Sequence, residues 1–351
     1  MQRIFITHIA PRDKILKYNL SSASCNFCYN LIESCVFDKT FSILPSFVKG
    51  NVDSFDGLIY SSLRKNKLRH FAPIVENLNL FRMIPRDASV WYYNCTILNI
   101  TLILLLKLLK PKAKQQIIIL DHTPSKNIFD RFLLWVSNHL NGTIRLADSP
   151  LFTCKNSVCL PGVVPSKAPQ FPEITNVKWE FLISGILGYN ISMLPMLLEV
   201  FSQLPHCTLH ITGKAPDITL IEKYVSSYKN IIYHGMVSRE EYLRILHDTP
   251  FLLSTRNPNS PENKCNFPSK IIEGLLHNRV ILSTLHYEQL NGIKYFLTGC
   301  NKDSFKQSIV EITKLPLNEL LSYANQSDIV RSKFNSNVWK DYIVKIENCS
   351  L

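Results

Sequence analysis

The chain has 351 residues, of which 46% are hydrophobic and 19% are charged, a composition that excludes an intrinsically disordered protein. This length predicts two domains, because a single hydrophobic core rarely extends beyond about 250–300 residues. Residues 1–165 carry 20 Lys and Arg against 10 Asp and Glu, whereas residues 166–351 carry 19 against 17. The basic first half predicts an anionic partner: a membrane surface, a nucleic acid or a phosphorylated acceptor. A solvated surface without a partner is the alternative.

Ten cysteines are present, and Cys25 and Cys28 are the one close pair with metal-ligand spacing. Because no second pair accompanies them, a zinc site is weakly supported and free thiols in a reducing compartment are expected. Residues 1–14 lack the long apolar core of a signal peptide. No run of 18 apolar residues occurs, so no membrane-spanning helix is expected. We therefore predict a cytoplasmic protein. Peripheral contact with the inner face of the cell membrane is a further possibility, which the basic first half and the segment Thr96–Lys114 suggest.

Short apolar segments alternate with helical patterns in the first half. Strands are expected at Arg3–Thr7, Thr40–Leu44, Leu58–Tyr60, Ser89–Tyr93, Gln115–Leu120, Thr143–Ala147 and Asn156–Leu160. A helix is expected at Asn127–Leu140, with one apolar face made of Phe129, Phe132, Leu133, Val136 and Leu140. Strands and helices alternating at this spacing predict a parallel sheet that is covered on both faces.

The most apolar segment is Thr96–Leu109, which is followed by Lys110, Lys112 and Lys114. It is too short to span a bilayer. A helix buried in the first domain is the first interpretation, and a helix lying in a membrane interface is the second. The basic segment Arg64–His70 is expected in a loop or on the surface of a helix.

Residues 161–172 contain four prolines, which predicts an extended linker between two domains. A second alternating unit follows. Its strands are expected at Trp179–Ser184, Cys207–Thr212, Asn230–Tyr233, Phe251–Ser254 and Arg279–Ser283, and its helices at Ile191–Leu204, Ile218–Tyr228, Ser238–Asp248 and within residues 266–278. A last helix is expected at Val338–Glu347, after a polar stretch. Ser238 with Glu241 forms the pattern of a capping box. The predicted organisation is a domain of residues 1–165, a domain of residues 166–335 and a terminal helix in residues 336–351.

Residues 266–278 carry the strongest functional signal. Pro268 suits the first turn of a helix, and Lys270 and Glu273 then lie on the same side of it. A cation in the first turn opposes the helix dipole unless an anion is bound there. A nearby carboxylate accepts hydrogen bonds from a vicinal diol, and a phosphate with a diol describes a nucleotide. The alternative is a surface helix on which Lys270 and Glu273 form a weak ion pair.

Small or polar residues stand at the ends of several predicted strands, where ligands of open α/β sheets bind. Gly185, Gly213 and Gly235 stand at three of these ends in the second half, and a glycine lets the backbone approach a ligand closely. Asp121 and His122 hold the corresponding position in the first half. G-x-G-x-x-G and Walker A sequences are absent, which argues against a nicotinamide or flavin site.

The order of these motifs resembles the donor-binding domain of the retaining glycosyltransferases of family 4, the group 1 glycosyltransferases with the GT-B fold. The matching segments are residues 183–185, 209–213, 232–235 with 241–242, 267–273 and 279–284. The form Phe-Pro-Ser-Lys-x-x-Glu is similar to that of bacterial enzymes that build surface polysaccharides such as lipopolysaccharide or capsule. The resemblance covers about residues 178–300 and implies an α/β fold of two Rossmann-like, doubly wound parallel-sheet domains that face each other across a cleft.

The resemblance implies a role for each matching residue. Glu273 would bind the ribose of a nucleotide sugar, Lys270 and the helix start would lie near the diphosphate, and His122 would lie near the transferred sugar. The residues assigned to catalysis are His122 and Glu273, and those assigned to donor binding are Gly185, Gly213, Arg256, Lys264, Ser269, Lys270 and Glu273.

The sequence departs from the family pattern at two places. Cys265 stands where the family commonly has the first of two glutamates. The usual Arg and Lys that neutralise the diphosphate are replaced by Ile186-Leu187 and Asn190. Arg256 and Lys264 are the candidates to compensate for them, because positive charge contributes most when the diphosphate leaves.

The function that the resemblance implies is transfer, with retention, of a sugar from a UDP or GDP donor to a hydroxyl of a polysaccharide or lipid-linked oligosaccharide. No metal and no cofactor are expected, since the Asp-x-Asp motif of metal-dependent enzymes is absent. A lipid-linked acceptor on an anionic membrane surface would fit the basic first domain. The alternatives are a sugar-nucleotide epimerase of the same fold and a catalytically impaired relative. A nucleic-acid partner is disfavoured, because no basic–aromatic stripe occurs.

Overall fold

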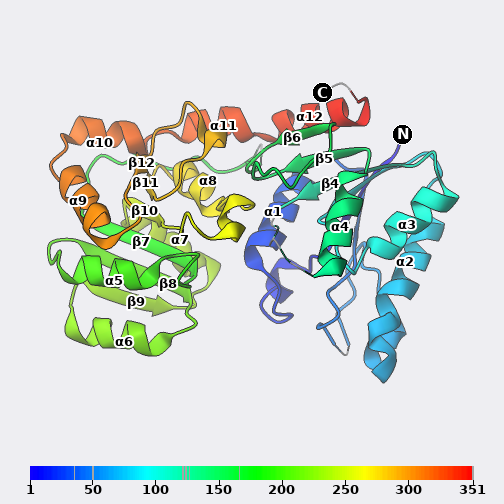
Figure 1. The fold of residues 1–351 in the computed structure, drawn as a ribbon, viewed down its shortest axis with the longest axis horizontal. Coiled ribbons are helices and arrows are strands. Elements are labelled where there is room, and N and C mark those ends of the chain that lie inside the picture. The colour runs from blue at the N-terminus through cyan, green and yellow to red at the C-terminus, as the bar shows by residue number, and fades with distance from the viewer. Residues whose placement is uncertain are drawn as a thin grey trace. The chain divides into compact units, whose positions relative to one another are not determined.

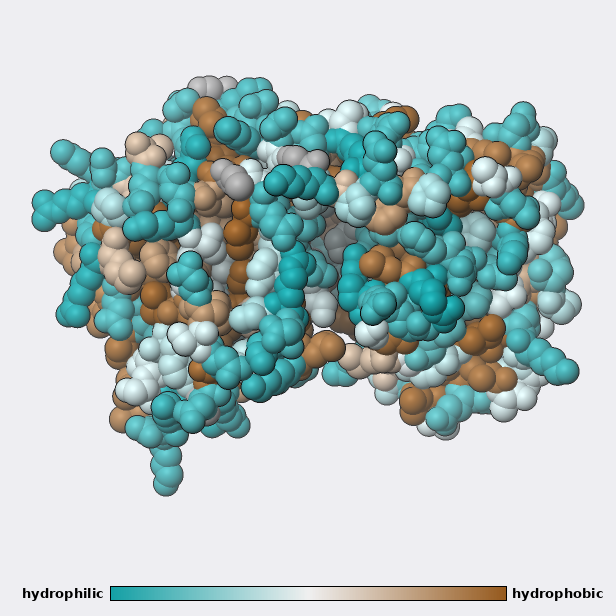
Figure 2. Space-filling view, turned by 180° about the vertical axis from the view of Figure 1, so that it is seen from behind, coloured by the Kyte–Doolittle hydropathy of each residue, from teal (hydrophilic) through white to brown (hydrophobic). Residues whose placement is uncertain are grey.

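The computed structural model describes residues 1–34, 36–49, 51–120, 122, 125, 127–165 and 167–349 (Figure 1). Its contacts divide the chain into two units. Unit 1 comprises residues 1–168, 265–267 and 334–351, and unit 2 comprises residues 169–264 and 268–333. Within the described residues, every helix is too short or too polar to cross a membrane. On the face shown in Figure 2, hydrophilic residues predominate and hydrophobic ones form separate patches.

In the described part of unit 1, six parallel strands form one sheet in the order β2-β1-β3-β4-β5-β6. The strands are β1 (Arg3–Thr7), β2 (Lys39–Ser42), β3 (Ser89–Tyr93), β4 (Lys114–Ile119), β5 (Gly142–Arg145) and β6 (Ser157–Cys159). The helices are α1 (Ser22–Glu33), α2 (Ala72–Met83), α3 (Ile100–Leu109), α4 (Ile128–Asn138) and α12 (Ser336–Glu347), with the 3-10 turns η1 (Arg12–Lys14), η2 (Ser62–Lys65) and η3 (Lys67–Phe71). All five residues of β3 are buried, as expected for a strand covered on both faces.

Helices α2, α3 and α4 cover one face of this sheet. Side chains that point to that face, such as Ile6 and Ile117, share one core cluster with Leu80 of α2, Leu106 of α3 and Val136 of α4. Right-handed crossovers between parallel strands place these helices together. Helix α3 is therefore a core helix, as the first interpretation of its apolar segment predicted, although its last residues are exposed.

Helices α1 and α12 pack together in unit 1. Phe27 of α1 lies edge-on to Trp339 of α12, with 5.7 Å between the ring centroids. The indole Nε1 of Trp339 donates a hydrogen bond to the carbonyl of Gly162 at 2.7 Å. Near the end of α12, Glu347 is buried and pairs with Arg3 of β1, with 2.9 Å between Nε and Oε2. The last helix of the chain is thus anchored to the first strand.

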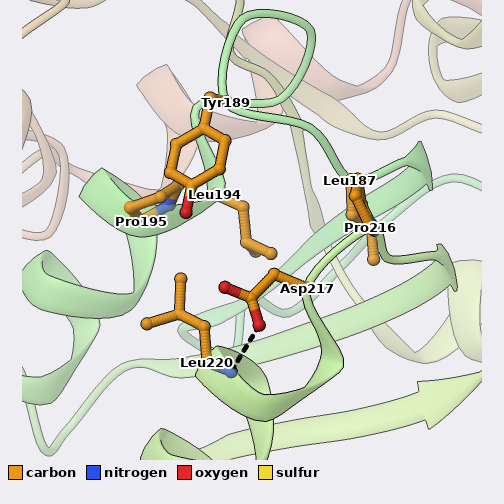
Figure 3. A pocket seen from close by; sticks show the side chains of 7 residues that line it. All are labelled: Leu187, Tyr189, Leu194, Pro195, Pro216, Asp217 and Leu220. Carbon is orange, nitrogen blue, oxygen red and sulfur yellow. Dashed lines mark hydrogen bonds between the residues drawn. The ribbon is translucent and has the colours of Figure 1, made fainter.

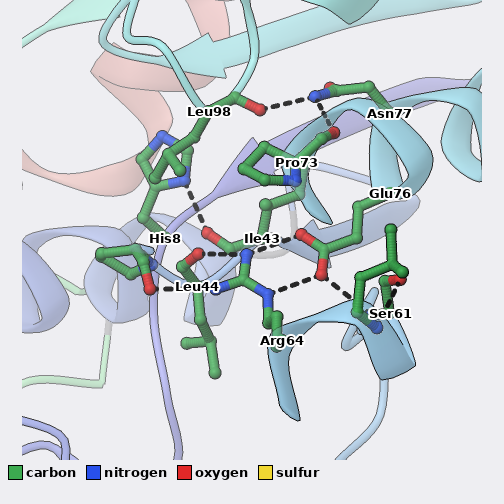
Figure 4. A network of polar contacts seen from close by, with 11 residues as sticks. His8, Ile43, Leu44, Ser61, Arg64, Pro73, Glu76, Asn77 and Leu98 are labelled. Atoms are coloured by element: carbon green, nitrogen blue, oxygen red, sulfur yellow. Dashed lines mark hydrogen bonds and ion pairs between the residues drawn. The ribbon is translucent and has the colours of Figure 1, made fainter. Parts of the chain in front are cut away.

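A buried ion pair holds the loop after β2 in unit 1 (Figure 4). Arg64 Nε and Glu76 Oε1 lie 2.6 Å apart, and the two side chains are 2% and 0% exposed. Arg64 also donates to the carbonyl of Leu44 at 2.6 Å, and Glu76 accepts the backbone N–H of Ser61 at 2.9 Å. The expectation of a surface position was therefore wrong for Arg64, because this guanidinium neutralises a buried carboxylate of α2.

In unit 2, the strands that the structure describes form a six-stranded parallel sheet in the order β12-β11-β10-β7-β8-β9. The strands are β7 (Glu180–Ile186), β8 (Thr208–Lys214), β9 (Ile231–Gly235), β10 (Phe251–Ser254), β11 (Val280–Ser283) and β12 (Phe296–Leu297). The helices are α5 (Leu194–Ser202), α6 (Ile218–Ser227), α7 (Arg239–Asp248), α8 (Ser269–Leu276), α9 (Lys302–Ile312), α10 (Leu317–Ala324) and α11 (Ser327–Phe334), with the 3-10 turns η4 (Pro261–Lys264) and η5 (Glu288–Leu290). This strand order is that of a doubly wound dinucleotide-binding sheet.

The predicted α/β class with two doubly wound parallel sheets is confirmed, and two local predictions were wrong. Leu58–Tyr60 is no strand, since only Leu58 makes an isolated bridge, to Ser42. Pro268 precedes α8 as its N-cap residue and does not lie in the first turn. The apolar face predicted for α4 is present, since Leu133 and Val136 pack in the unit 1 core, although Phe129 and Phe132 on the same face are 39% and 38% exposed.

Candidate functional site

The candidate site of unit 2 lies at the point where its strand order reverses. β7 pairs with β8 on one side and with β10 on the other, so the connections that follow β7 and β10 run in opposite directions. Such a reversal opens a crevice beyond the carboxyl ends of the two strands, where open α/β sheets bind ligands. The segment that leads from β10 to α8 begins at this edge.

Two glycines pair across β7 and β8 at the same edge. Gly185 and Gly213 are opposite each other, and both have positive φ angles, of 112° and 130°. A Cβ on residue 213 would lie 2.0 Å from the carbonyl oxygen of Gly185. The backbones of β7 and β8 therefore approach each other too closely here for a side chain on residue 213. The absence of side chains also leaves room for a side chain from α8.

Lys270 of α8 provides that side chain. Its Cε lies 3.6 Å from the position that a Cβ on Gly185 would take. Its Nζ lies 4.2 Å from the ring centroid of Tyr242 and 3.8 Å from Oε2 of Glu273. Burial lowers the pKa of Lys270, and the carboxylate of Glu273 opposes this effect. The predicted side-by-side placement of Lys270 and Glu273 is thus present in the structure.

Glu273 is held by more than its own helix. Arg239 of α7 forms an ion pair with its Oε1, and the Tyr242 hydroxyl donates to its Oε2 at 2.9 Å. Burial raises the pKa of Glu273, but Lys270, Arg239 and the Tyr242 hydrogen bond outweigh it, so the net pKa lies below its ordinary value. The side chain is 20% exposed. Glu273 is therefore an ionised, partly exposed carboxylate that is held in place where the strand order of unit 2 reverses.

The first turns of α7 supply the two residues that sequence reasoning did not assign to the site, Arg239 and Tyr242. The Ser238 side chain accepts the backbone N–H of Glu241 at 3.2 Å, which starts α7 as the capping pattern predicted. Tyr242 is buried, and this burial, followed by the nearby charge of Glu273, raises its pKa well above the ordinary value. The capping pattern placed both residues near a helix start, but nothing in it indicated their partner.

The loops after β7 and β10 are joined by asparagines. The backbone N–H of Asn257 donates to the Asn190 carbonyl at 2.9 Å, and the Asn263 amide donates to the same oxygen at 3.0 Å. Asn190 therefore ties the loops together at a position where the resemblance leads us to expect a lysine. Arg256 is partly buried and donates to Asn263 Oδ1 at 3.1 Å, while Lys264 is exposed at the end of η4.

The start of α8 has no side-chain cap. Its N-cap residue, Pro268, carries no hydrogen-bonding side chain, and Ser269 is the exposed first residue of the helix. The first N–H groups of an α-helix have no partner within the helix, so they favour an anion. Ser269 and Lys270 thus open the helix that also carries Glu273.

The remaining predicted residue, His122, belongs to unit 1. Its ring lies edge-on to Phe152, with 5.8 Å between centroids, and burial lowers its pKa. Its backbone N–H donates to Asn266 Oδ1 at 2.7 Å, within the short segment 265–267 that groups with unit 1. Cys265 in the same segment is buried, with its sulfur 3.4 Å from the Ser149 hydroxyl. Asp121, expected beside His122, lies outside the described residues.

Unit 1 has its own hollow at the carboxyl ends of β1 and β3, where its strand order reverses. The cavity has a volume of about 230 Å³ and is lined by His8, Ile9, Leu20, Ser21, Ser24, Cys25, Pro45, Phe47 and Tyr93. Nδ1 of His8 lies 2.8 Å from the Ile43 carbonyl oxygen (Figure 4), and burial lowers the pKa of His8 to about 4. The lining is therefore uncharged at neutral pH, and sequence reasoning missed it because its residues come from distant segments.

A further hollow in unit 2 is too small for a ligand. Figure 3 shows it between the starts of α5 and α6, and its volume is about 10 Å³, room for roughly one water molecule. Its acidic residue, Asp217, accepts the backbone N–H of Leu220 at 3.1 Å and so caps α6. This hollow plays no part in the site.

No protein-family model and no curated protein sequence matches the chain. Solved structures do match it along its whole length. An alpha,alpha-trehalose-phosphate synthase (UDP-forming) from Burkholderia xenovorans, in complex with glucose-6-phosphate, is 8% identical, with a TM-score of 0.68 and coverage of 99% of this chain and 100% of that one. Anabaena HepE in complex with UDP is 11% identical, with a TM-score of 0.65 and coverage of 99% and 100%. The N-terminal domain of a Candida albicans trehalose-6-phosphate phosphatase is 10% identical, with a TM-score of 0.68 and coverage of 100% and 97%.

These similarities establish the fold. The chain has the GT-B fold, with two parallel sheets and interleaved helices, as the sequence predicted. Similarity at 8–11% identity shows the fold and not the activity of this chain. One of the three proteins is named as a phosphatase and another as a synthase.

Proposed function

We propose that the chain is a retaining glycosyltransferase, which moves a sugar from a nucleotide-diphosphate donor to a hydroxyl of a polysaccharide or lipid-linked oligosaccharide. The observation that carries the proposal is the cluster of Lys270, Glu273 and Arg239 beside Gly185 at the switch point of unit 2. A carboxylate for a diol, cations for a diphosphate and a glycine that admits close approach are the parts that a nucleotide sugar needs. The GT-B fold supports the same reading.

Glu273 binds the ribose hydroxyls in this proposal. Its two oxygens offer about four acceptor positions; Arg239 and Tyr242 use two of them, and Lys270 Nζ lies 3.8 Å from Oε2. The other positions remain for the donor. Because the pKa of Glu273 is lowered, the carboxylate is ionised and ready to accept at neutral pH.

The diphosphate lies at the start of α8, where Lys270 and the N–H groups that follow Pro268 meet it. Gly213 keeps the strand edge free of side chains, and Arg256 and Lys264 remain the further cations proposed for this charge. As the sugar–phosphate bond breaks, the departing diphosphate gains charge and the sugar carbon becomes oxocarbenium-like. The cations stabilise that charge, and the acceptor hydroxyl attacks from the same face and gives its proton to the departing diphosphate, without a metal or a cofactor.

Unit 1 receives the acceptor in this proposal. His122 contributes near the transferred sugar, and the uncharged hollow beside His8 is a second candidate acceptor contact. The surplus of positive charge in residues 1–165 suits an acceptor on a polyprenyl-diphosphate carrier at the cytoplasmic membrane face.

The second candidate is a sugar-nucleotide epimerase or a catalytically impaired relative. Two residues that depart from the family pattern favour it. Asn190 joins two loops where the family pattern has a lysine, and Cys265 is buried where it has a glutamate. An epimerase would convert the donor with no acceptor present. An impaired relative would bind nucleotides without any turnover.

A thermal-shift panel of UDP, GDP and their sugars tests the proposal. One nucleotide class should raise the Tm of the parent chain, and its sugar should be released onto an added acceptor. A panel in which no nucleotide shifts the Tm would overturn it. Donor conversion without an acceptor would favour the epimerase.

A further inference from the structure

The hollow of unit 1 lies at the start of helix α1. Ser21, Ser24 and Cys25 line it from that end of the helix, and Phe47 lines it from the segment after β2. Ser21 is exposed and Phe47 is 55% exposed, whereas Cys25 is 2% exposed, so the hollow is open to solvent at one end and closed by the core at the other. Its volume of about 230 Å³ is below the roughly 300–1,000 Å³ of pockets for drug-sized ligands, and it has room for a single ring.

The lining of this hollow carries no net charge at neutral pH. Among the described residues that line it there is no Lys, Arg, Asp or Glu. Burial lowers the pKa of His8 to about 4, so its imidazole is neutral. The charge of Arg64 reaches His8 through space, but this guanidinium is already paired with Glu76 (Figure 4). A phosphate or carboxylate in the hollow would therefore be buried without an ion partner, which is costly.

The starts of α1 and α8 differ in the same sense. The Ser21 side chain accepts the backbone N–H of Ser24 at 3.3 Å and thereby caps α1, whose first turn contains no basic residue. Helix α8 follows Pro268 without a side-chain cap, and Lys270 lies in its first turn. A capped start without a cation offers an anion less than an uncapped start with one. Unit 2 therefore suits a diphosphate, and the hollow of unit 1 suits a neutral group.

The hollow combines apolar walls with a few polar groups. Its apolar side chains are Ile9, Leu20, Pro45 and Phe47. Nδ1 of His8 lies 2.8 Å from the Ile43 carbonyl oxygen, so Nδ1 carries the proton, and Nε2, 3.3 Å from the Thr96 hydroxyl, is an acceptor. The hydroxyls of Ser21 and Ser24 add donors. A wholly apolar ligand would leave these groups without partners, whereas a sugar ring offers an apolar face and hydroxyls at its edge.

We propose that this hollow holds one uncharged sugar ring, the end of the acceptor, and that the chain therefore extends an existing glycan. The inference rests on the proposed transferase reaction and narrows it. An acceptor whose reacting sugar carries a phosphate or a carboxylate is excluded, and so is direct transfer to a phosphorylated carrier. A separate reaction that places the first neutral sugar on the carrier must supply the acceptor, and the anionic part of a lipid-linked acceptor lies outside the hollow.

Saturation-transfer NMR of the full chain with methyl glycosides tests the proposal without a donor. Neutral methyl glucoside, galactoside, mannoside and N-acetylglucosaminide are compared with their 6-phosphates and with the methyl uronides. Ser24→Leu fills the hollow from α1, and Ser22→Leu is the matched control, because Ser22 is an exposed residue of the same turn outside the lining. Thermal unfolding checks that each variant folds. Phe47→Ser, with Leu16→Ser as its control, serves if Ser24→Leu does not fold, since Leu16 is 67% exposed in the same unit.

At least one neutral glycoside should bind the parent chain and Ser22→Leu equally, and its charged counterparts should bind about tenfold more weakly or less, because their charge would lack a partner. Ser24→Leu should lose glycoside affinity by a similar factor and keep the UDP or GDP affinity of the parent, because unit 2 is unchanged. Charged glycosides that bind as well as neutral ones would overturn the inference. So would a Ser24→Leu chain that binds glycosides like the parent, or a parent chain that binds none.

The same measurements separate this inference from the proposed reaction. A parent chain that binds a nucleotide but no glycoside would contradict the sugar site and leave the transferase standing. A parent chain that binds a neutral glycoside but no nucleotide would contradict the transferase and leave the sugar site standing.

Discussion

Arg239, in the first turn of α7, forms an ion pair with Glu273, in the middle of α8. The Tyr242 hydroxyl donates to the other oxygen of the same carboxylate at 2.9 Å. Two helices that follow different strands therefore fix one side chain at the switch point of the unit 2 sheet. In the proposed donor site, this arrangement would supply positive charge in place of the cations that the family pattern has after Gly185.

Replacing Arg239 should weaken nucleotide-diphosphate binding. In Arg239→Gln the ion pair with Glu273 is lost and so is a cation of the proposed diphosphate site, and affinity should fall about tenfold, as for a charge-assisted hydrogen bond. Arg244→Gln on the same helix is the matched control, since Arg244 pairs with Glu241 on the exposed side of α7. Titration calorimetry with UDP and GDP measures both variants. An equal loss of nucleotide affinity in Arg239→Gln and Arg244→Gln would show that Arg239 has no specific role.

Gly213→Ala should destabilise the chain and damage the site. The positive φ angle of 130° costs an alanine about 1–3 kcal/mol, and its Cβ would lie 2.0 Å from the Gly185 carbonyl oxygen. Gly188→Ala is the control, because a Cβ there meets no described atom within 4 Å, and its effect should stay within about 0.5 kcal/mol. Denaturant unfolding of the two variants gives the comparison. A Gly213→Ala chain as stable as the parent would contradict the close approach of the two strands.

Breaking the buried ion pair in unit 1 should be costly. Glu76→Gln leaves Arg64 charged and only 2% exposed, which should lower the free energy of unfolding by about 3–5 kcal/mol. Removing both charges in Arg64→Met, Glu76→Leu should cost less than the single change, because no unpaired charge stays buried. Guanidinium unfolding curves distinguish the two cases. A double variant less stable than Glu76→Gln would show that the hydrogen bonds of Arg64 to Leu44 and Pro45 dominate.

The free energy of unfolding should fall as the pH is lowered from about 6.5 towards 5. Burial is the first cause that lowers the pKa of His8, His210 and His277 to about 4, whereas in the unfolded chain histidine titrates near 6.5. In this window the unfolded chain binds protons that the folded chain does not, so stability present above pH 6.5 is lost on acidification, by up to about 1.4 kcal/mol per pH unit for each histidine. Urea unfolding between pH 7 and pH 5 measures the slope. His8→Gln should give a shallower slope, and an unchanged slope would remove His8 from this account.

The strands and the order of motifs could be predicted from the sequence because they depend on local patterns. β3 and β10 were placed residue for residue, since each is a short apolar run that is buried on both faces. Strand β12 escaped prediction because two residues give no periodic signal. Helix α4 was predicted with its apolar face, but periodicity alone could not show that Val136 is buried while Phe132, one turn earlier on the same face, is 38% exposed.

In the candidate site, too, contacts within one helix could be predicted and contacts between separate segments could not. Lys270 and Glu273 are neighbours on one helix, so their spacing was enough to place them together. The ion pair of Glu273 with Arg239 joins two helices, and no pattern within either helix encodes it. The same holds for Asn190, whose contacts with Asn257 and Asn263 arise only when the loops after β7 and β10 meet.

The central claim is that Glu273 binds the ribose of a nucleotide, and calorimetric titration of Glu273→Ala with UDP and GDP tests it most directly. Glu273→Gln serves as a second variant that keeps the shape of the side chain. The account predicts that the parent chain binds one of the two nucleotides and that Glu273→Ala binds it at least tenfold more weakly while its Tm without ligand stays close to that of the parent. A Glu273→Ala chain that binds the nucleotide as tightly as the parent would contradict the account.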